Sequence, residues 1–150
     1  MPRLEELVGR IPVYPEAERT DKRLRFLAQL SAAQWYVGEG AKRTDPYLSA
    51  WAAQRLVLFG CRLLLAHNRV LYPYHKWLIR TVAELPEKPD DLLPLATALL
   101  HEPTVATAEA FALSVLLFTE WPQPTAAWSA TFIEDSEWNW LDHPPPIEDA

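Results

Sequence analysis

Prolines are frequent in this sequence and glycines are scarce, which limits the folds that it can adopt. There are 14 prolines and four glycines. Sheet proteins need many Gly or Asn turns, while phosphate-binding loops and dinucleotide-binding fingerprints need clustered glycines. The prolines fall between long apolar stretches, where they begin and end helices. The sequence therefore excludes a glycine-rich phosphate loop, disfavours most β folds and predicts an all-α protein.

Length and apolar content indicate one folded domain. Of the 150 residues, 49% are apolar, a fraction that supports a sizeable core. We expect a single helical domain over residues 1–150, with its core at about 16–141 and an extended, proline-rich tail at 142–150. The net charge of −6 argues against a nucleic-acid partner. The lone Cys61 excludes an intramolecular disulfide framework.

The sequence shows neither the pattern of a signal peptide nor that of a membrane-spanning helix. The first ten residues, MPRLEELVGR, carry charges where a signal peptide needs an apolar core. No apolar run reaches the roughly 18 residues of a membrane span. We therefore expect a cytoplasmic protein without a membrane partner.

Apolar periodicity and the prolines predict an up-and-down bundle of five to six helices. Asp45 is the expected N-cap of the second helix and Pro46 its first residue. This helix is apolar almost all round, which predicts a central position. The expected ranges are 16–43, 46–71, a short helix from Pro73 to before Pro86, 92–101, 105–120 and 126–141.

Three arginines recur at intervals of seven along the second predicted helix. Arg55, Arg62 and Arg69 should share one stripe, because seven residues drift by only about 20° around a helix. Cations on a mostly buried helix need partners. They either pair with carboxylates of neighbouring helices, such as Glu109, or form a wall that binds a phosphate or carboxylate ligand.

The most distinctive segment is AHNRVLYPYHKWL, residues 66–78. It gathers polar and aromatic side chains around a proline break, where ligand-binding groups often collect. The alternative is structural: a helix C-cap, with aromatic residues that anchor the turn. The candidate ligand-binding residues here are Asn68, Arg69, Tyr72, Tyr74, Lys76 and Trp77.

This segment resembles the N-R-x-L-Y-P-x-x-K-W-L signature in the helical C-terminal half of certain bacterial nucleotidyltransferase-like proteins. The matching positions are Asn68, Arg69, Leu71, Tyr72, Pro73, Lys76, Trp77 and Leu78. The run FIEDSEWNW, residues 132–140, also resembles the end of those proteins, so the resemblance covers about residues 20–150. It implies a helical bundle similar to the substrate-binding domain of kanamycin nucleotidyltransferase, which closes over the nucleotide site and holds the acceptor substrate.

The catalytic half of that family's pattern is missing. Those enzymes carry a Gly-Ser turn and a D-x-D pair that hold Mg²⁺ and the triphosphate. This chain has no Gly-Ser dipeptide, and its adjacent acids, such as Asp90-Asp91, lack a strand context. The resemblance therefore implies a non-catalytic module without a cofactor of its own. Its expected partners are a separate nucleotidyltransferase catalytic chain and a nucleotide or other anionic small molecule.

The acidic C-terminal run supplies two further candidate ligand-binding residues, Asp135 and Glu137. A carboxylate there would act as a base or substrate contact if the bundle docked on a catalytic partner. The alternative is a solvated acidic face. No histidine or cysteine pattern typical of a metal site is present.

Two other functions remain open. Arg62 and His67 form R-L-L-L-A-H, which resembles the R-x4-6-H motif of helical HEPN ribonucleases. Those enzymes often use the pair across a dimer to activate a ribose hydroxyl. The third alternative is an oligomeric structural protein, such as a homodimer, whose arginines are merely paired.

Overall fold

All regular secondary structure is helical in the part of the chain that the computed structural model describes, residues 13–136, 138 and 147. No strand occurs in these residues, so the all-α prediction is confirmed. Short 3-10 helices precede α2 and α4. The elements are η1 (Glu16–Glu18), α2 (Arg19–Arg43), α3 (Pro46–His67), η2 (His75–Trp77), α4 (Leu78–Ala83), α5 (Leu92–His101), α6 (Val105–Leu116) and α7 (Trp128–Ser136).

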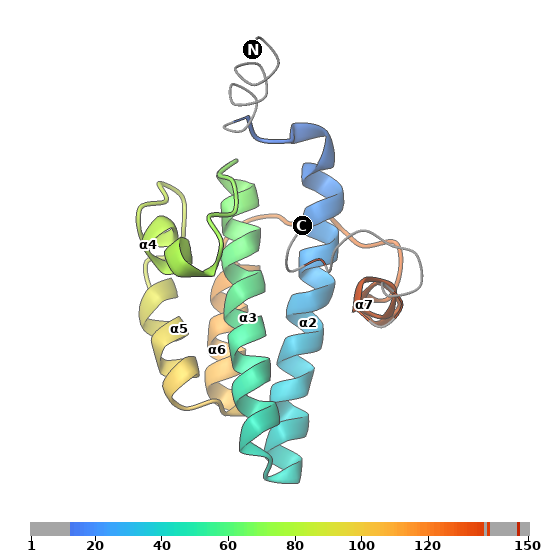
Figure 1. Cartoon of the computed structure of the whole chain (residues 1–150), viewed down its shortest axis with the longest axis vertical. Coiled ribbons are helices and arrows are strands. Elements are labelled where there is room, and N and C mark those ends of the chain that lie inside the picture. Colours follow the sequence, from blue (N-terminus) through green and yellow to red (C-terminus); the bar gives the residue numbers. More distant parts are fainter. Residues whose placement is uncertain (1–12, 137, 139–146, 148–150) are drawn as a thin grey trace, which may run out of the picture.

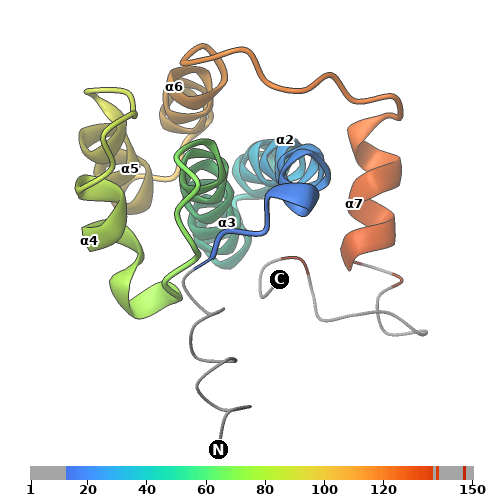
Figure 2. The same ribbon diagram turned by 90° about the horizontal axis from the view of Figure 1, so that it is seen from above.

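Four helices run up and down beside one another to form the bundle. They are α2, α3, α5 and α6, and the short α4 lies beside α3, above α5 (Figure 1). Helix α7 lies crosswise next to α2, at the end of a linker that follows α6 (Figure 2). The C-terminal half of the chain therefore wraps two different sides of the α2–α3 hairpin.

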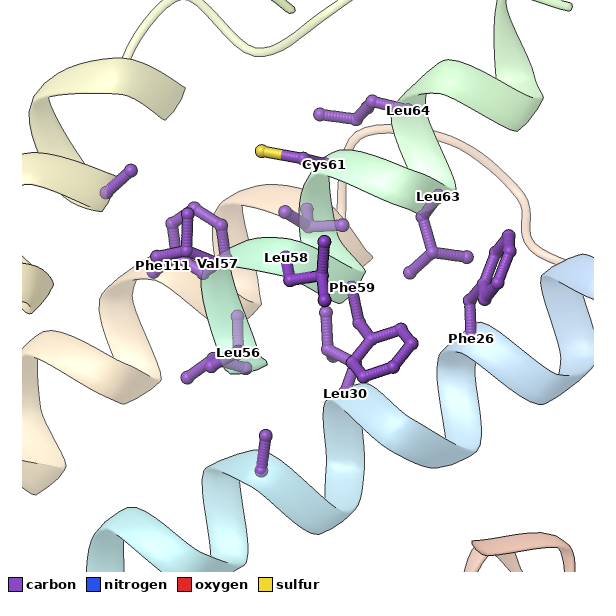
Figure 3. Packing of buried hydrophobic residues seen from close by; sticks show 14 of the residues in the cluster. Phe26, Leu30, Leu56, Val57, Leu58, Phe59, Cys61, Leu63, Leu64 and Phe111 are labelled. Atoms are coloured by element: carbon purple, nitrogen blue, oxygen red, sulfur yellow. The ribbon is translucent and has the colours of Figure 1, made fainter. Parts of the chain in front are cut away.

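Helix α3 lies at the centre of the bundle, as its all-round apolar pattern predicts. Its Phe59 and Leu63 are fully buried and lie toward α2, where Phe26 also packs (Figure 3). On another side α6 approaches closely because Gly60 lacks a side chain. A Cβ at Gly60 would lie 2.6 Å from the ring of Phe111. By length and composition α3 could span a membrane, but 72% of its most apolar window is buried inside the bundle.

Several helices begin or end where the prolines, capping residues and apolar pattern predict. Asp45 caps α3, its carboxylate accepting a hydrogen bond from the Leu48 amide at 3.1 Å, and Pro46 is the first helical residue. Helix α5 spans the predicted residues 92–101. Thr104 and Thr107 form a capping box at the start of α6.

Other predicted ends are wrong. Helix α3 stops at His67 rather than at residue 71, because Arg69 takes up a left-handed conformation with φ of 56°. The helix predicted to begin at Pro73 is the 3-10 helix η2 from His75, followed by α4 from Leu78, and α6 ends at Leu116 instead of residue 120. Helix α7 starts at Trp128, two residues later than predicted, while its predicted end at 141 and most of the tail at 142–150 lie outside the described residues.

Candidate functional site

The predicted site residues of segment 68–77 follow α3 at one end of the hairpin. Two of them have positive φ: Arg69 at 56° and Tyr74 at 64°. Tyr74 combines this φ with ψ of 168°, a region that residues other than glycine rarely adopt and that costs about 1–3 kcal/mol. Such strained positions are common at ligand-binding and interaction sites.

The predicted arginine stripe is wrong for its third member. Arg69 lies beyond α3 and pairs with Glu16, with Nε at 2.8 Å from Oε2 and Nη2 at 3.1 Å from Oε1. Arg55 remains on the helix, where its Nη2 donates to Gln29 Oε1 at 2.9 Å and its guanidinium lies 5.0 Å from the Trp51 ring. Arg55 and Arg69 therefore lie in separate environments, and neither environment is shared with Arg62.

Arg62 and Tyr72 do come together, as the predicted site requires. The Arg62 guanidinium lies 3.9 Å from the centre of the Tyr72 ring and 4.7 Å from that of Phe26. Arg62 is 3% exposed and is the one buried charged residue in the described part of the chain. These two residues line a cavity of about 290 Å³, here called the basic cavity, together with Tyr14, Pro15, Lys22, Phe26, Leu65, Ala66, Val70 and Leu71.

Arg19 fixes the helix ends that form this cavity. Its Nε donates to the Ala66 carbonyl at 2.8 Å, and its Nη2 donates to the His67 carbonyl at 3.0 Å. A cation at a helix C-terminus satisfies carbonyls that lack a partner within the helix. The start of α2 is thereby held against the end of α3.

The turn beyond the cavity presents aromatic and cationic side chains to solvent. Tyr74 is 61% exposed, Trp77 is 48% exposed and Ile79 is 46% exposed. Lys76 Nζ lies 5.4 Å from the centre of the Trp77 ring, and the Arg80 guanidinium lies 5.8 Å from it. We call Tyr74, Lys76, Trp77, Ile79 and Arg80 the docking patch.

Arg62 and His67, the pair named by the ribonuclease alternative, have different neighbours within the chain. Arg62 faces Phe26 and Tyr72, whereas the His67 ring packs edge-on against Phe118 and Trp121. His67 Nε2 lies 2.6 Å from Glu87 Oε2. The two side chains of the R-L-L-L-A-H motif thus lie in different surroundings within one chain.

Cys61 is buried in the core, and Asp135 is paired with an arginine. Burial raises the pKa of the Cys61 thiol to about 12, which keeps it neutral and unreactive. Asp135 accepts from Arg25 Nε at 3.0 Å and lies 2.9 Å from its Nη2, so it anchors α7 to α2. Glu137 lies outside the described residues. In the part of the chain that is described, no three metal-ligating side chains cluster.

Asp135 borders a second hollow, which the sequence did not predict. This cleft of about 1110 Å³ lies between α2, the linker after α6 and α7. Trp121 and Trp128 contribute aromatic surface, and Arg25 and Asp135 contribute the ion pair. Its size follows from the crosswise position of α7, which a helix prediction does not contain.

One protein family matches this sequence. The family model of a domain of unknown function, DUF4037, matches residues 2–78, just over half of the chain. The chain belongs to the DUF4037 family. No curated protein and no solved structure matches it.

The DUF4037 match covers both helices that frame the basic cavity. It contains α2, α3 and the turn as far as Trp77 and Leu78, whereas α5, α6 and α7 lie beyond it. The nucleotidyltransferase resemblance is not part of this finding, since the matched family carries no assigned function. The cavity and the turn are thus features of the family's own region.

Several residues of the basic cavity were not candidates from the sequence, among them Tyr14, Lys22 and Phe26. A signal for two of them was present. In an antiparallel hairpin both helices rise by the same amount per residue, so residues equally far from the turn at 44–45 lie side by side. This rule places Phe26 opposite Leu63 and Lys22 opposite His67, next to Arg62 and Ala66.

Proposed function

We propose that this chain is a non-catalytic helical docking domain that works with a separate catalytic chain of nucleotidyltransferase type. The docking patch would contact that chain. The observation that carries the proposal is the exposure of Trp77 beside Lys76 and Arg80, with Tyr74 and Ile79 also exposed within three residues of it along the chain. Exposed apolar groups that form a patch mark interaction sites, and Tyr, Trp and Arg are enriched in protein interfaces.

The backbone of the patch supports a role in binding. Tyr74 has both a strained conformation and a side chain that is mostly in solvent. Burial in the core therefore does not account for the strain, whereas an interaction made by the side chain would. The neighbouring rings of Tyr72 and His75, at 6.1 Å and 4.9 Å, hold the Tyr74 ring in place.

Charge indicates the kind of surface that the partner presents. The whole chain carries a net charge of −6, so Lys76 and Arg80 form a local exception. Glu84 lies 3.8 Å from Arg80, with both side chains mostly exposed, and contributes little. An acidic, partly aromatic surface on the catalytic chain would complement this patch.

The test uses a nucleotidyltransferase-type protein that carries a Gly-Ser turn and D-x-D and is encoded beside this chain. The two proteins are expressed together, and their Kd is measured by calorimetry. Trp77→Ala should raise the Kd about 30-fold or more, because a central tryptophan contributes about 2 kcal/mol or more to an interface. The chain alone should transfer no nucleotide.

Tyr47→Ala is the matched control, because Tyr47 is a 79% exposed aromatic residue in the first turn of α3, at the far end of the hairpin. It should leave the Kd unchanged. Absence of wild-type binding, or an unchanged Kd in Trp77→Ala, would contradict the proposal. RNA cleavage by the purified chain that disappears in His67→Ala would replace it with the ribonuclease alternative.

A further inference from the structure

Helix α6 carries two apolar stripes on opposite faces. The stripe that packs into the bundle consists of the buried residues Ala108, Phe111, Ala112 and Val115. A second stripe, here called the outer stripe, is spaced by four, three and four residues and consists of Ala106, Ala110, Leu113 and Leu117. At about 100° per residue, the members of the outer stripe lie within about 60° of one another and nearly opposite the buried stripe. Leu117 belongs to it because its backbone, as the C-cap, is still helical.

The outer stripe is in solvent in the single chain. Leu113 is 44% exposed and Leu117 is 80% exposed, and both alanines are exposed as well. In the part of the chain that the structure describes, no helix lies on the side of α6 that faces away from α2 and α3 (Figure 2). A helix with apolar residues on all sides is normally buried on all sides. The outer stripe therefore indicates that α6 is covered in an assembly.

Charge indicates what covers it. Helix α5, which packs beside α6, contains no Asp, Glu, Lys or Arg, and α6 contains only Glu109. Glu109 is exposed and lies about 60° to one side of the stripe, where its carboxylate can remain in solvent. The whole chain carries a net charge of −6, so two copies repel each other over most of their surfaces. The neutral surface of α6 is where a second copy meets the least repulsion.

The order of small and large residues along the outer stripe matches a second copy that runs antiparallel. Two-fold symmetry about the middle of the stripe sets Ala106 opposite Leu117 of the second copy, and Ala110 opposite Leu113 of the second copy. Both pairs share this midpoint, between residues 111 and 112. A small residue then faces a large one at every level, which allows close packing without a void. A parallel pair would instead set alanine against alanine at one end and leucine against leucine at the other.

We propose that this chain forms a two-fold homodimer in which the outer stripes of two α6 helices pack antiparallel. One pair of short helices buries less than the roughly 800 Å² per partner of a standard interface, so the dimer should be weak, with a Kd of about 10–100 µM. The docking patch belongs to α4 and the turn before it. The dimer therefore does not depend on the proposed function.

The experiment is sedimentation equilibrium of the full chain at concentrations from about 5 to 500 µM, which bracket the expected Kd. The mean mass should rise from the 17.2 kDa of one chain toward twice that value. Leu113→Glu should raise the Kd of the dimer about 30-fold or more, because it sets a carboxylate without a partner in the apolar contact. Leu117→Glu should act in the same direction, and its 80% exposure makes it harmless to the fold of the single chain.

Ile133→Glu is the matched control, because Ile133 is a 39% exposed aliphatic residue of α7, away from the outer stripe. It should leave the Kd of the dimer unchanged. Trp77→Ala should also dimerise like the wild type, whether or not it still binds the catalytic chain. The two proposals can therefore fail separately.

Cysteine cross-linking tests the antiparallel direction. Ala106→Cys and Leu117→Cys are prepared as separate proteins, in which the native Cys61 is buried and does not react. A mixture of the two should form a disulfide between them, whereas neither should link to itself, because like cysteines would lie about 16 Å apart along the helices.

Three results would overturn the proposal. The first is a wild-type chain that stays monomeric at about 500 µM, well above the expected Kd. The second is a dimer that persists unchanged in both Leu113→Glu and Leu117→Glu, or that is lost equally in Ile133→Glu or Trp77→Ala. The third is a disulfide that forms within one cysteine variant and not in the mixture.

Discussion

At the scale of single residues, Asn68 shows how one side chain sets the geometry of the site. Its Nδ2 donates to the Leu64 carbonyl at 2.8 Å and to the Glu87 carbonyl at 2.7 Å, while its Oδ1 accepts from the Glu87 amide at 3.1 Å. One amide group thus satisfies backbone groups of α3 and of the loop before α5. Asn68 therefore caps the end of α3 and links it to the loop before α5, and both the nitrogen and the oxygen of its side-chain amide form hydrogen bonds within the chain.

Asn68→Ala should therefore destabilise the fold. Three hydrogen bonds are lost and backbone groups of Glu87 lose their partner, so we expect the free energy of unfolding to fall by about 2–3 kcal/mol. Urea unfolding followed by circular dichroism measures this change. Gln54→Ala, at an exposed position of α3, should change stability by less than about 0.5 kcal/mol. Equal stability of the two variants would show that the Asn68 contacts contribute little.

At the scale of elements, the turn between α2 and α3 carries a local strain. Thr44 ends α2 with φ of 53° and ψ of 41°, the left-handed conformation that usually belongs to glycine at this position. A branched Cβ makes this conformation costly. The turn is still well bonded, since the Asp45 amide donates to the Gly40 carbonyl at 2.9 Å.

Thr44→Gly should stabilise the hairpin. The relief of strain outweighs the added entropy of the unfolded chain, and we expect a gain of about 1 kcal/mol in the free energy of unfolding. Thr97→Gly is the matched control, because Thr97 is exposed within α5, where replacing threonine by glycine should cost about 0.3 kcal/mol. Thermal and urea unfolding compare the two. A loss of stability in Thr44→Gly would refute this account of the turn.

How far the sequence predicts each element depends on whether local or distant residues set its limits. The start of α3 follows from Asp45 and Pro46, and it was predicted correctly. Both ends of α5 follow from the apolar pattern of that segment and were also predicted correctly. The end of α3 was not, because Val70 and Leu71 continue its apolar pattern. The break depends on the left-handed Arg69 and on the bond between Asn68 and Glu87, 19 residues away.

The candidate site shows the same difference between features set by nearby residues and features set by residues distant in the sequence. Arg62 and Tyr72, ten residues apart and both candidates from the sequence, line the same cavity. Lys22 and Phe26 come from another helix, and they required the register of the hairpin. Tyr14 comes from the segment before η1, whose path no periodic pattern determines. The pairing of Arg69 with Glu16, 53 residues apart, was equally inaccessible.

At the scale of the whole molecule, α7 is attached to the bundle mainly through α2. Its contacts include the ion pair of Asp135 with Arg25, the Ser136 hydroxyl that accepts from Gln29 at 2.9 Å, and the ring of Phe132 beside Tyr36. The crosswise position of α7 opens the large cleft. A weakened α7 contact should therefore change the cleft while leaving the α2–α3 core intact.

A double-mutant cycle on Arg25 and Asp135 tests this attachment. Their side chains are 25% and 11% exposed, so the pair is partly shielded and its coupling energy should reach about 1–2 kcal/mol. Asp135→Asn should speed hydrogen exchange of the α7 amides and leave α3 unchanged, because α7 opens locally before the core unfolds. Slow exchange in α7 of Asp135→Asn, with no coupling to Arg25→Gln, would instead leave Asp135 available for the ligand contact that the sequence suggested.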